Sequence, residues 1–380
     1  MNEKFSRFVA YDCSYYLGDR PCVWHKQKGH LCICEHHTPL KGNLLIIKLD
    51  AMGDVLRTTC LLPMISRLWP GMRVTWITRA ESIPLLERNP YITDILPYGT
   101  EAVIHLAARV FDKVINLDAG RVSATLASMA KAKEKIGFIL HEEGYVIATN
   151  DAAEDWLKMG IFDDLKKANQ RTYQEIMCSI VGLTLDGMRY VFDLTDEEIE
   201  KGSQHLQTMG VDLKKSIIGI HTGGGGRWAQ KQWIEENFIE LIVQLKRELG
   251  QSVSILLLGG PQEKEQNQRI LRRVEGLAIA VGCDNTVRHL AALIRSCSVV
   301  LSGDSLPMHV ALAMGRRVVV LFGPTSHSEI ELFGLGEKVI PDLDCIVCYK
   351  QVCDCKPNCM ELITVNMVKQ AMLRQLSLSF

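Results

Sequence analysis

The chain has 380 residues, 47% of them hydrophobic, and its 43 Lys and Arg residues are nearly balanced by 44 Asp and Glu residues. This length exceeds what one hydrophobic core normally supports, so we expect two domains with appendages. A formal net charge of −1 provides no general basic field for nucleic acid or for an anionic bilayer. Any anionic ligand must therefore be held by local groups.

No stretch of the sequence has the pattern of a signal peptide or a membrane-spanning helix, because residues 1–10 mix charges with short apolar pieces and no later segment stays apolar for long enough. We therefore expect a cytoplasmic protein without an integral membrane segment. In a reducing compartment, 13 Cys residues do not indicate a disulfide framework. Nine of them gather near the two ends of the chain, and metal binding is the leading explanation for both groups.

Residues 1–40 are rich in Cys, His, Tyr and Gly and show no sustained hydrophobic period, so we expect a small irregular module there. From residue 43 onward, apolar runs that predict strands alternate with stretches that predict helices. In this first series we predict strands at 43–48, 73–78 and 113–117 and helices at 55–68, 83–88 and 123–130.

A second series follows a polar, acidic stretch at 193–215. There we predict strands at 217–221, 254–258, 278–281, 299–302 and 318–322 and helices at 233–249, 262–274, 287–296 and 307–314. Apolar strands separated by helices are typical of parallel, doubly wound α/β sheets, and two such sheets form a ligand cleft between their carboxyl edges. The predicted parts are the Cys/His-rich module at 1–40, α/β domains at 41–192 and 193–340, and a Cys-rich segment with a last helix at 341–380.

The loop after the first predicted strand carries Gly53 and Asp54 and opens a helix. A carboxylate there can face the cleft, where it could take part in acid–base chemistry, or it can simply cap the helix. Gly53 fits either a tight turn or the close approach of a ligand. The spacing alone leaves both interpretations of Asp54 open.

Two further loops leave strands of the second series. The first has four consecutive glycines, 223–226, followed by Lys231, and it can cradle a phosphate or be an ordinary flexible loop with a solvated lysine. In the second, Asp304 and Ser305 begin a helix that carries His309. These three residues can face a ligand, or they can be ordinary helix caps and a buried core histidine.

Taken together and in this order, the three loops resemble those of glycosyltransferase family 9, the ADP-heptose heptosyltransferases. The resemblance covers about residues 43–334. It is carried by Met-Gly-Asp ending at Asp54, the glycine run with Lys231 and Trp233, Leu-Gly-Gly-Pro at 258–261, Asp-Ser at 304–305 with His309, and Leu-Phe-Gly-Pro-Thr at 321–325.

This resemblance implies a GT-B fold, in which two Rossmann-like domains face a central cleft, the first holding the acceptor and the second the nucleotide sugar. It implies an inverting transfer from ADP-heptose without a catalytic metal, with Asp54 as general base and Lys231 stabilising the departing diphosphate. The implied donor-binding residues are Thr222, Gly223, Gly224, Lys231, Glu263, Asp304, Ser305, Leu306, Met308 and His309.

By the same resemblance, Asp304 binds hydroxyls of the donor sugar, Glu263 reaches the ribose, and His309 lies near the phosphates or orders its loop. The chain departs from the family at Leu306, where the family usually has Gly, and the added side chain narrows the expected sugar pocket. A GT-B enzyme for another nucleotide sugar, or an epimerase acting on one, is therefore an alternative. The sequence does not reveal the acceptor. It does not reveal the oligomeric state either, and a homo-oligomer is one of the possibilities.

The C-terminal Cys residues are dense enough to indicate thiolate coordination of structural zinc or iron, an iron–sulfur centre included. They are Cys345, Cys348, Cys353, Cys355 and Cys359. In this respect the chain resembles the bacterial autotransporter heptosyltransferases, which implies a cysteine-ligated iron. The alternative to metal binding is a patch of reduced, partly buried cysteines. The alternative to an active transferase is a metal-sensing protein on an inactive transferase scaffold.

A second set near the N-terminus, with four His residues nearby, can form a zinc or iron site of its own. It comprises Cys13, Cys22, Cys32 and Cys34, with His25, His30, His36 and His37. It can also share ligands with the C-terminal set, because the last helix of GT-B enzymes, predicted here at 365–376, often crosses back to the first domain.

Overall fold

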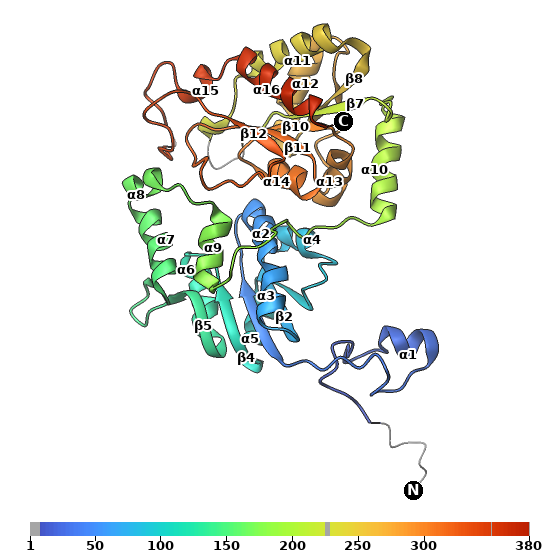
Figure 1. The fold of residues 1–380 in the computed structure, drawn as a ribbon, viewed down its shortest axis with the longest axis vertical. Helices are drawn as coiled ribbons and strands as arrows, with labels where there is room; N and C mark the ends of the chain where they lie inside the picture. Colours follow the sequence, from blue (N-terminus) through green and yellow to red (C-terminus); the bar gives the residue numbers. More distant parts are fainter. Residues whose placement is uncertain (1–7, 225–228, 351, 380) are drawn as a thin grey trace.

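Two six-stranded β-sheets form the body of the protein (Figure 1). This computed structural model describes residues 8–224, 229–350 and 352–379. The strands of the first sheet lie in the order β3-β2-β1-β4-β5-β6, and all neighbours are parallel except the antiparallel pair β5 and β6. Their bounds are β1 Gly42–Ile47, β2 Met72–Thr78, β3 Asp94–Pro97, β4 Val110–Asn116, β5 Lys131–Leu140 and β6 Val146–Ala148.

The helices of the first domain cover this sheet. They are α2 Met52–Thr58, α3 Leu62–Leu68, α4 Ile83–Leu86, α5 Thr100–Ala108, α6 Arg121–Met129, α7 Asp151–Ile161, α8 Asp163–Ala168 and α9 Tyr173–Val181. The single helix predicted at 55–68 is divided into α2 and α3 by a 3-10 turn at Thr59–Leu61. Pro63, in the first turn of α3, has no N–H to continue the α-helical hydrogen bonds across that point.

The second sheet is parallel throughout, in the order β12-β11-β10-β7-β8-β9. Its strands are β7 Ser216–His221, β8 Val253–Leu258, β9 Ile279–Ala280, β10 Val299–Gly303, β11 Arg317–Leu321 and β12 Gly336–Val339. Its helices are α10 Asp196–Thr208, α11 Glu235–Leu249, α12 Lys264–Val274, α13 Val287–Arg295, α14 Leu306–Ala313, α15 Cys359–Leu362 and α16 Val365–Ser377. Both sheets have the strand order of a doubly wound α/β fold, so the predicted fold class is confirmed.

Buried apolar side chains connect the two domains. One cluster lines a face of each sheet and is continuous between them, with Leu56 of α2 and Met308 of α14 among its members. Two further clusters lie on the opposite faces of the two sheets. Helices α2 and α14 contact each other across the domain boundary, so the loops that precede them are held close together.

The prediction that the last helix crosses back to the first domain is wrong. Helix α16 packs on α11 and on β10, β11 and β12 of its own domain. Its apolar face, which includes Val368 and Met372, is buried there in the second domain's core, and this burial holds the helix in place. The N-terminal segment with α1, Val23–Lys28, lies beyond the far end of the first domain (Figure 1), so the two Cys-rich ends do not meet. Within the described ranges, no helix has both the length and the apolar character needed to span a bilayer.

Candidate active site

A cavity of about 800 Å³ lies between the two domains, and its position follows from the strand order. In each sheet the order reverses between two neighbouring strands, β1 and β4 in the first sheet and β7 and β10 in the second. Loops that leave such a pair diverge to opposite faces of the sheet and open a crevice at its carboxyl edge. Residues that follow each of these four strands line the cavity.

The cavity brings together residues that lie far apart in the sequence and that were predicted as site residues. They are Asp54, Gly224, Lys231, Asp304, Ser305, Leu306 and His309. Asp54 comes from the first domain and the others come from the second. The cavity is therefore walled by both domains.

Asp54 lies in the first turn of α2 with 34% of its side chain exposed. Its Oδ1 lies 2.8 Å from Nη2 of Arg57. Its Oδ2 accepts a hydrogen bond from the backbone N–H of Ala51 at 3.2 Å, so the residue caps the helix while its carboxylate lines the cavity.

Burial alone would raise the pKa of Asp54, but the charges of Arg57 and Lys48 more than offset that effect and lower the pKa below its usual value. Asp54 is therefore ionised at neutral pH. This is the form that can accept a proton.

Lys231 and Asp304 form an ion pair in the wall contributed by the second domain. Nζ of Lys231 lies 2.9 Å from Oδ2 of Asp304 and 2.9 Å from its backbone carbonyl oxygen. The two side chains are largely buried, with 13% and 18% exposed. Burial would raise the pKa of Asp304, but the neighbouring Lys231 lowers it below its usual value, so the carboxylate is ionised.

His309 belongs both to the cavity wall and to the domain contact. It lies in the first turns of α14, and its Nδ1 is 3.2 Å from the hydroxyl oxygen of Tyr190. A Cβ atom at Gly53 would lie 2.8 Å from Cδ2 of His309, so only glycine lets α2 approach this ring so closely. Burial, assisted by the charge of Arg57, lowers the pKa of His309 to about 4, so its imidazole is neutral at neutral pH.

Four predicted donor-binding residues do not line the cavity. They are Thr222, Gly223, Glu263 and Met308. The Thr222 hydroxyl donates a hydrogen bond to Oδ1 of Asn267 at 2.6 Å, and Oε2 of Glu263 accepts one from the backbone N–H of Gly260 at 2.8 Å. The Met308 side chain is fully buried in the core. The rest of the glycine-rich loop, residues 225–228, lies outside the described residues.

Several residues that line the cavity were not predicted from the sequence. Arg57 is buried and its guanidinium carbon lies 3.6 Å from the centroid of the Tyr173 ring. Its spacing of three residues from Asp54 places both on one helix face, which is a pattern that could have been noticed. Trp156, Lys166, Glu329 and Tyr349 also line the cavity, but they come from segments without a recognisable motif.

The five C-terminal cysteines lie close enough to influence one another. The pKa of Cys355 is raised by a hydrogen bond with Cys345 and by the proximity of Cys345 and Cys353. Burial raises the pKa of Cys359 to about 11, with smaller contributions from Cys348 and Cys353. Within the described residues, however, no three of these sulfur atoms lie within 4.8 Å of one another, so their role as metal ligands stays a prediction.

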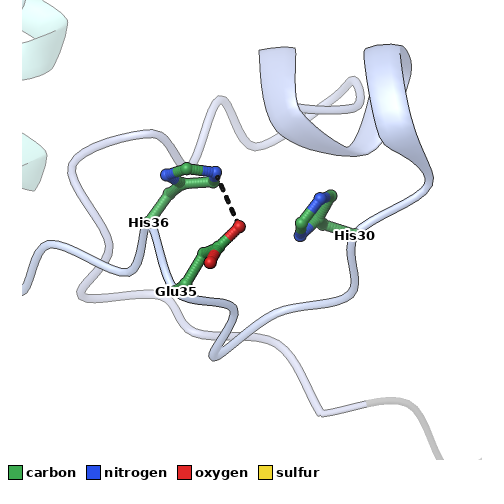
Figure 2. A group of neighbouring side chains, drawn as sticks. All are labelled: His30, Glu35 and His36. Atoms are coloured by element: carbon green, nitrogen blue, oxygen red, sulfur yellow. Dashed lines mark ion pairs between the residues drawn. The ribbon is translucent and has the colours of Figure 1, made fainter.

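The four N-terminal cysteines line a smaller cavity of about 280 Å³ together with several histidines. In the described part of the chain, however, the one group of three or more ligand side chains whose ligand atoms all lie within 4.8 Å of one another is His30, Glu35 and His36 (Figure 2). This group contains no cysteine. The ligand set predicted for this end of the chain is therefore not the one that the structure brings together.

Comparison with known proteins identifies the family. The model of glycosyltransferase family 9 (heptosyltransferase) matches residues 103–357. The chain belongs to glycosyltransferase family 9. Family 9 membership and the two-domain fold together make it a glycosyltransferase, as the resemblance of its loops implied.

Individual family 9 proteins match most of the chain at low identity. Lipopolysaccharide core heptosyltransferase OpsX of Haemophilus influenzae is 22% identical over 299 residues, which cover 75% of this chain and 80% of OpsX. The family 9 glycosyltransferase of Veillonella parvula has a TM-score of 0.72 at 19% identity and covers 89% of this chain and 98% of that one.

TibC of enterotoxigenic E. coli H10407 also has this fold. This dodecameric, iron-containing heptosyltransferase was solved with ADP-D-beta-D-heptose and has a TM-score of 0.56 at 13% identity, covering 90% of this chain and 79% of TibC. These likenesses confirm the GT-B architecture.

Proposed function

We propose that the protein transfers a heptose from ADP-heptose to an acceptor hydroxyl, with inversion at the anomeric carbon. The observation that carries the proposal is the cavity between the domains, where an ionised Asp54 lies in one wall and the Lys231–Asp304 pair in the other. The relatives named as heptosyltransferases, and the ADP-heptose bound to TibC, support this donor.

The reaction follows from these positions. The acceptor oxygen attacks the anomeric carbon, the bond from that carbon to the diphosphate oxygen breaks, and Asp54 takes the acceptor's proton. Negative charge grows on the departing ADP, and Lys231 stabilises it in a largely buried setting where a charge acts strongly. Closing of the two domains around the bound donor would exclude water that would otherwise hydrolyse it.

The second domain is proposed to bind the sugar through Asp304 and through the start of α14. The backbone N–H groups at this helix start, together with the helix dipole, favour an anionic ligand. Leu306, the first residue of α14, lines the cavity, and its side chain occupies space that glycine would leave free. Because of this side chain, a different nucleotide sugar is the second candidate donor.

The test of the proposal compares two neighbouring carboxylates. The assay measures ADP release from ADP-heptose, with a total extract of the native host as the source of acceptors. Asp54→Asn keeps the shape of the side chain but removes its basicity, so we expect the rate of ADP release to fall about 100-fold or more. Donor affinity should change by less than about twofold, because a general base acts on the acceptor.

The matched control is Asp50→Asn. Asp50 is 56% exposed, pairs with Arg79 at 2.5 Å and does not line the cavity, so its loss should leave ADP release nearly unchanged. An Asp54→Asn variant that releases ADP at the wild-type rate would show that another group accepts the proton.

We also propose that the C-terminal cysteines hold a structural zinc or iron, as the resemblance implied. The proximity of Cys355 to Cys345 and Cys353 and the iron content stated for TibC support this. Thiolates suit either metal, and no catalytic step depends on it. Replacing Cys345 and Cys348 with Ser should lower the metal content of the purified protein, as measured by elemental analysis, and unchanged metal content would refute the assignment.

A further inference from the structure

The N-terminal module, residues 8–41, has almost no hydrophobic core. Ala10 is its one buried residue, and helix α1 buries none of its side chains. Large apolar side chains such as Tyr11, Leu31 and Ile33 are more than half exposed. Since ordering a chain costs conformational entropy, a segment with so little burial needs another source of stability.

Three side chains of this module converge on one point. His30, Glu35 and His36 offer ligand atoms that all lie within 4.8 Å of one another. Nε2 of His36 lies 3.4 Å from Oε1 of Glu35, and Figure 2 shows the His30 ring on the other side of the same carboxylate. Ligands of a zinc ion, each about 2 Å from the metal, lie somewhat closer together than this, so small side-chain rotations would complete the site.

The environment of the His36 ring also favours the binding of a cation. Its Nε2 atom is shielded from solvent and, apart from the 3.4 Å contact with Glu35, which lacks hydrogen-bond geometry, it has no hydrogen-bond partner among the described residues. A buried polar atom without a partner is unfavourable, and coordination would satisfy it. The ring is already held in place, because it stacks on the indole of Trp24 with the ring centroids 3.6 Å apart and an interplanar angle of 16°.

The loop that carries His30 is held in a similar way. Nδ1 of His25 lies 2.9 Å from the backbone carbonyl oxygen of His30, which ties that loop to α1. Supporting contacts of this kind orient ligands around a metal. His37 does not belong to this group of ligands, because its Nε2 lies 3.3 Å from Oδ1 of Asp12.

We propose that the N-terminal module binds a zinc ion through one ring nitrogen each of His30 and His36 and the carboxylate of Glu35. Two imidazoles and one carboxylate form a recognised zinc set, which leaves a fourth position for water or for one thiol of the adjoining cavity. The ion holds the module together. The module lies beyond the start of β1, away from the cavity between the domains (Figure 1), so the role of the ion is structural.

The test uses the full chain, stripped with a chelator and then titrated with zinc. Wild type should bind one zinc equivalent more than His30→Ala or His36→Ala. Glu35→Gln should lower the affinity for that zinc at least about tenfold. The control His37→Ala should retain it. Equal zinc binding by wild type, His30→Ala and His36→Ala would overturn the proposal, even if replacing the four nearby cysteines with Ser removed the metal.

Proteolysis provides a second measurement that does not depend on counting metal. Lys26 and Lys28 of α1 are exposed, so trypsin should cleave there when the module lacks its ion. Zinc should slow this cleavage at least tenfold in wild type and in His37→Ala but not in His30→Ala. Cleavage that is equally fast with and without zinc in wild type would contradict a structural ion at this site.

Discussion

Arg57 is the residue that keeps Asp54 ionised, since it lies 2.8 Å from the carboxylate and lowers its pKa. In the proposed mechanism the deprotonated form is active, so activity is lost as the pH falls through the pKa of Asp54. Arg57→Met removes the opposing charge, and the pKa should rise by about one unit or more. The acid limb of the pH profile of kcat/KM for ADP release should move to higher pH by the same amount.

Arg67→Met is the control for this shift. Arg67 pairs with Asp186 at 2.9 Å on the surface, with 61% of its side chain exposed, so its removal should leave the acid limb in place. An acid limb that stays fixed in Arg57→Met would mean that Asp54 is not the titrating group.

At the level of single residues, the sequence predicted the groups that occur in recognisable loops and missed those that do not. Asp54, Lys231 and Asp304 line one cavity because the loops that carry them leave strands beside the reversal in strand order. Glu329 and Tyr349 reach the same cavity from irregular segments, Glu329 after β11 and Tyr349 after β12. Only tertiary packing brings these two residues there, so no local pattern could reveal them.

Helix α2 can approach α14 because Gly53 has no side chain. Gly53→Ala would place a Cβ atom 2.8 Å from Cδ2 of His309, and we expect a net loss of about 1–3 kcal/mol in the free energy of unfolding from overpacking. Chemical denaturation would measure the loss. The result would also report on the domain contact, since the two helices belong to different domains.

Gly160→Ala is the matched control for this substitution. Gly160 lies inside α7, and a Cβ atom there would meet nothing within 4 Å. Helix propensity should then dominate, with a gain of up to about 1 kcal/mol. A Gly53→Ala variant as stable as Gly160→Ala would show that the helices separate at no cost.

Among the elements, strands with continuous apolar runs were predicted well, while several helices, α5, α9 and α10 among them, were missed. Helix α10 lies in the stretch described from sequence only as polar and acidic, yet Thr195 and Glu198 form a reciprocal cap at its start. That capping pattern is readable in the sequence. The position of α16 was predicted incorrectly, because an apolar helix face does not reveal which domain will bury it.

In the whole molecule, Arg288 of α13 joins the two domains and the segment between them. Its guanidinium donates to the carbonyl oxygens of Pro84 and Asp193 at 3.0 and 2.7 Å, and to Glu198 at 2.5 and 2.8 Å. Arg288→Met would leave these acceptors without their donor in a largely buried place. We expect a loss of about 2–4 kcal/mol in stability, seen as a lower melting temperature.

Arg269→Met is the comparison for Arg288. Arg269 also makes paired contacts with a glutamate, Glu235, but 49% of its side chain is exposed and both partners belong to the second domain. Its loss should cost less than about 1 kcal/mol. Equal melting temperatures for the two variants would contradict a special role for Arg288 in holding the domains together.

Thermal stabilisation of the purified protein by ADP, ADP-heptose, UDP, GDP and CMP would show which nucleotide the cavity between the domains binds. A ligand that binds only the folded state stabilises it by about 2.7 kcal/mol at 100 times its Kd. We expect ADP and ADP-heptose to raise the melting temperature selectively, and Lys231→Ala, which lacks the cation facing Asp304, to lose this response. A preference for UDP or GDP, or no response to any of the five ligands, would contradict the proposal that ADP-heptose is the donor.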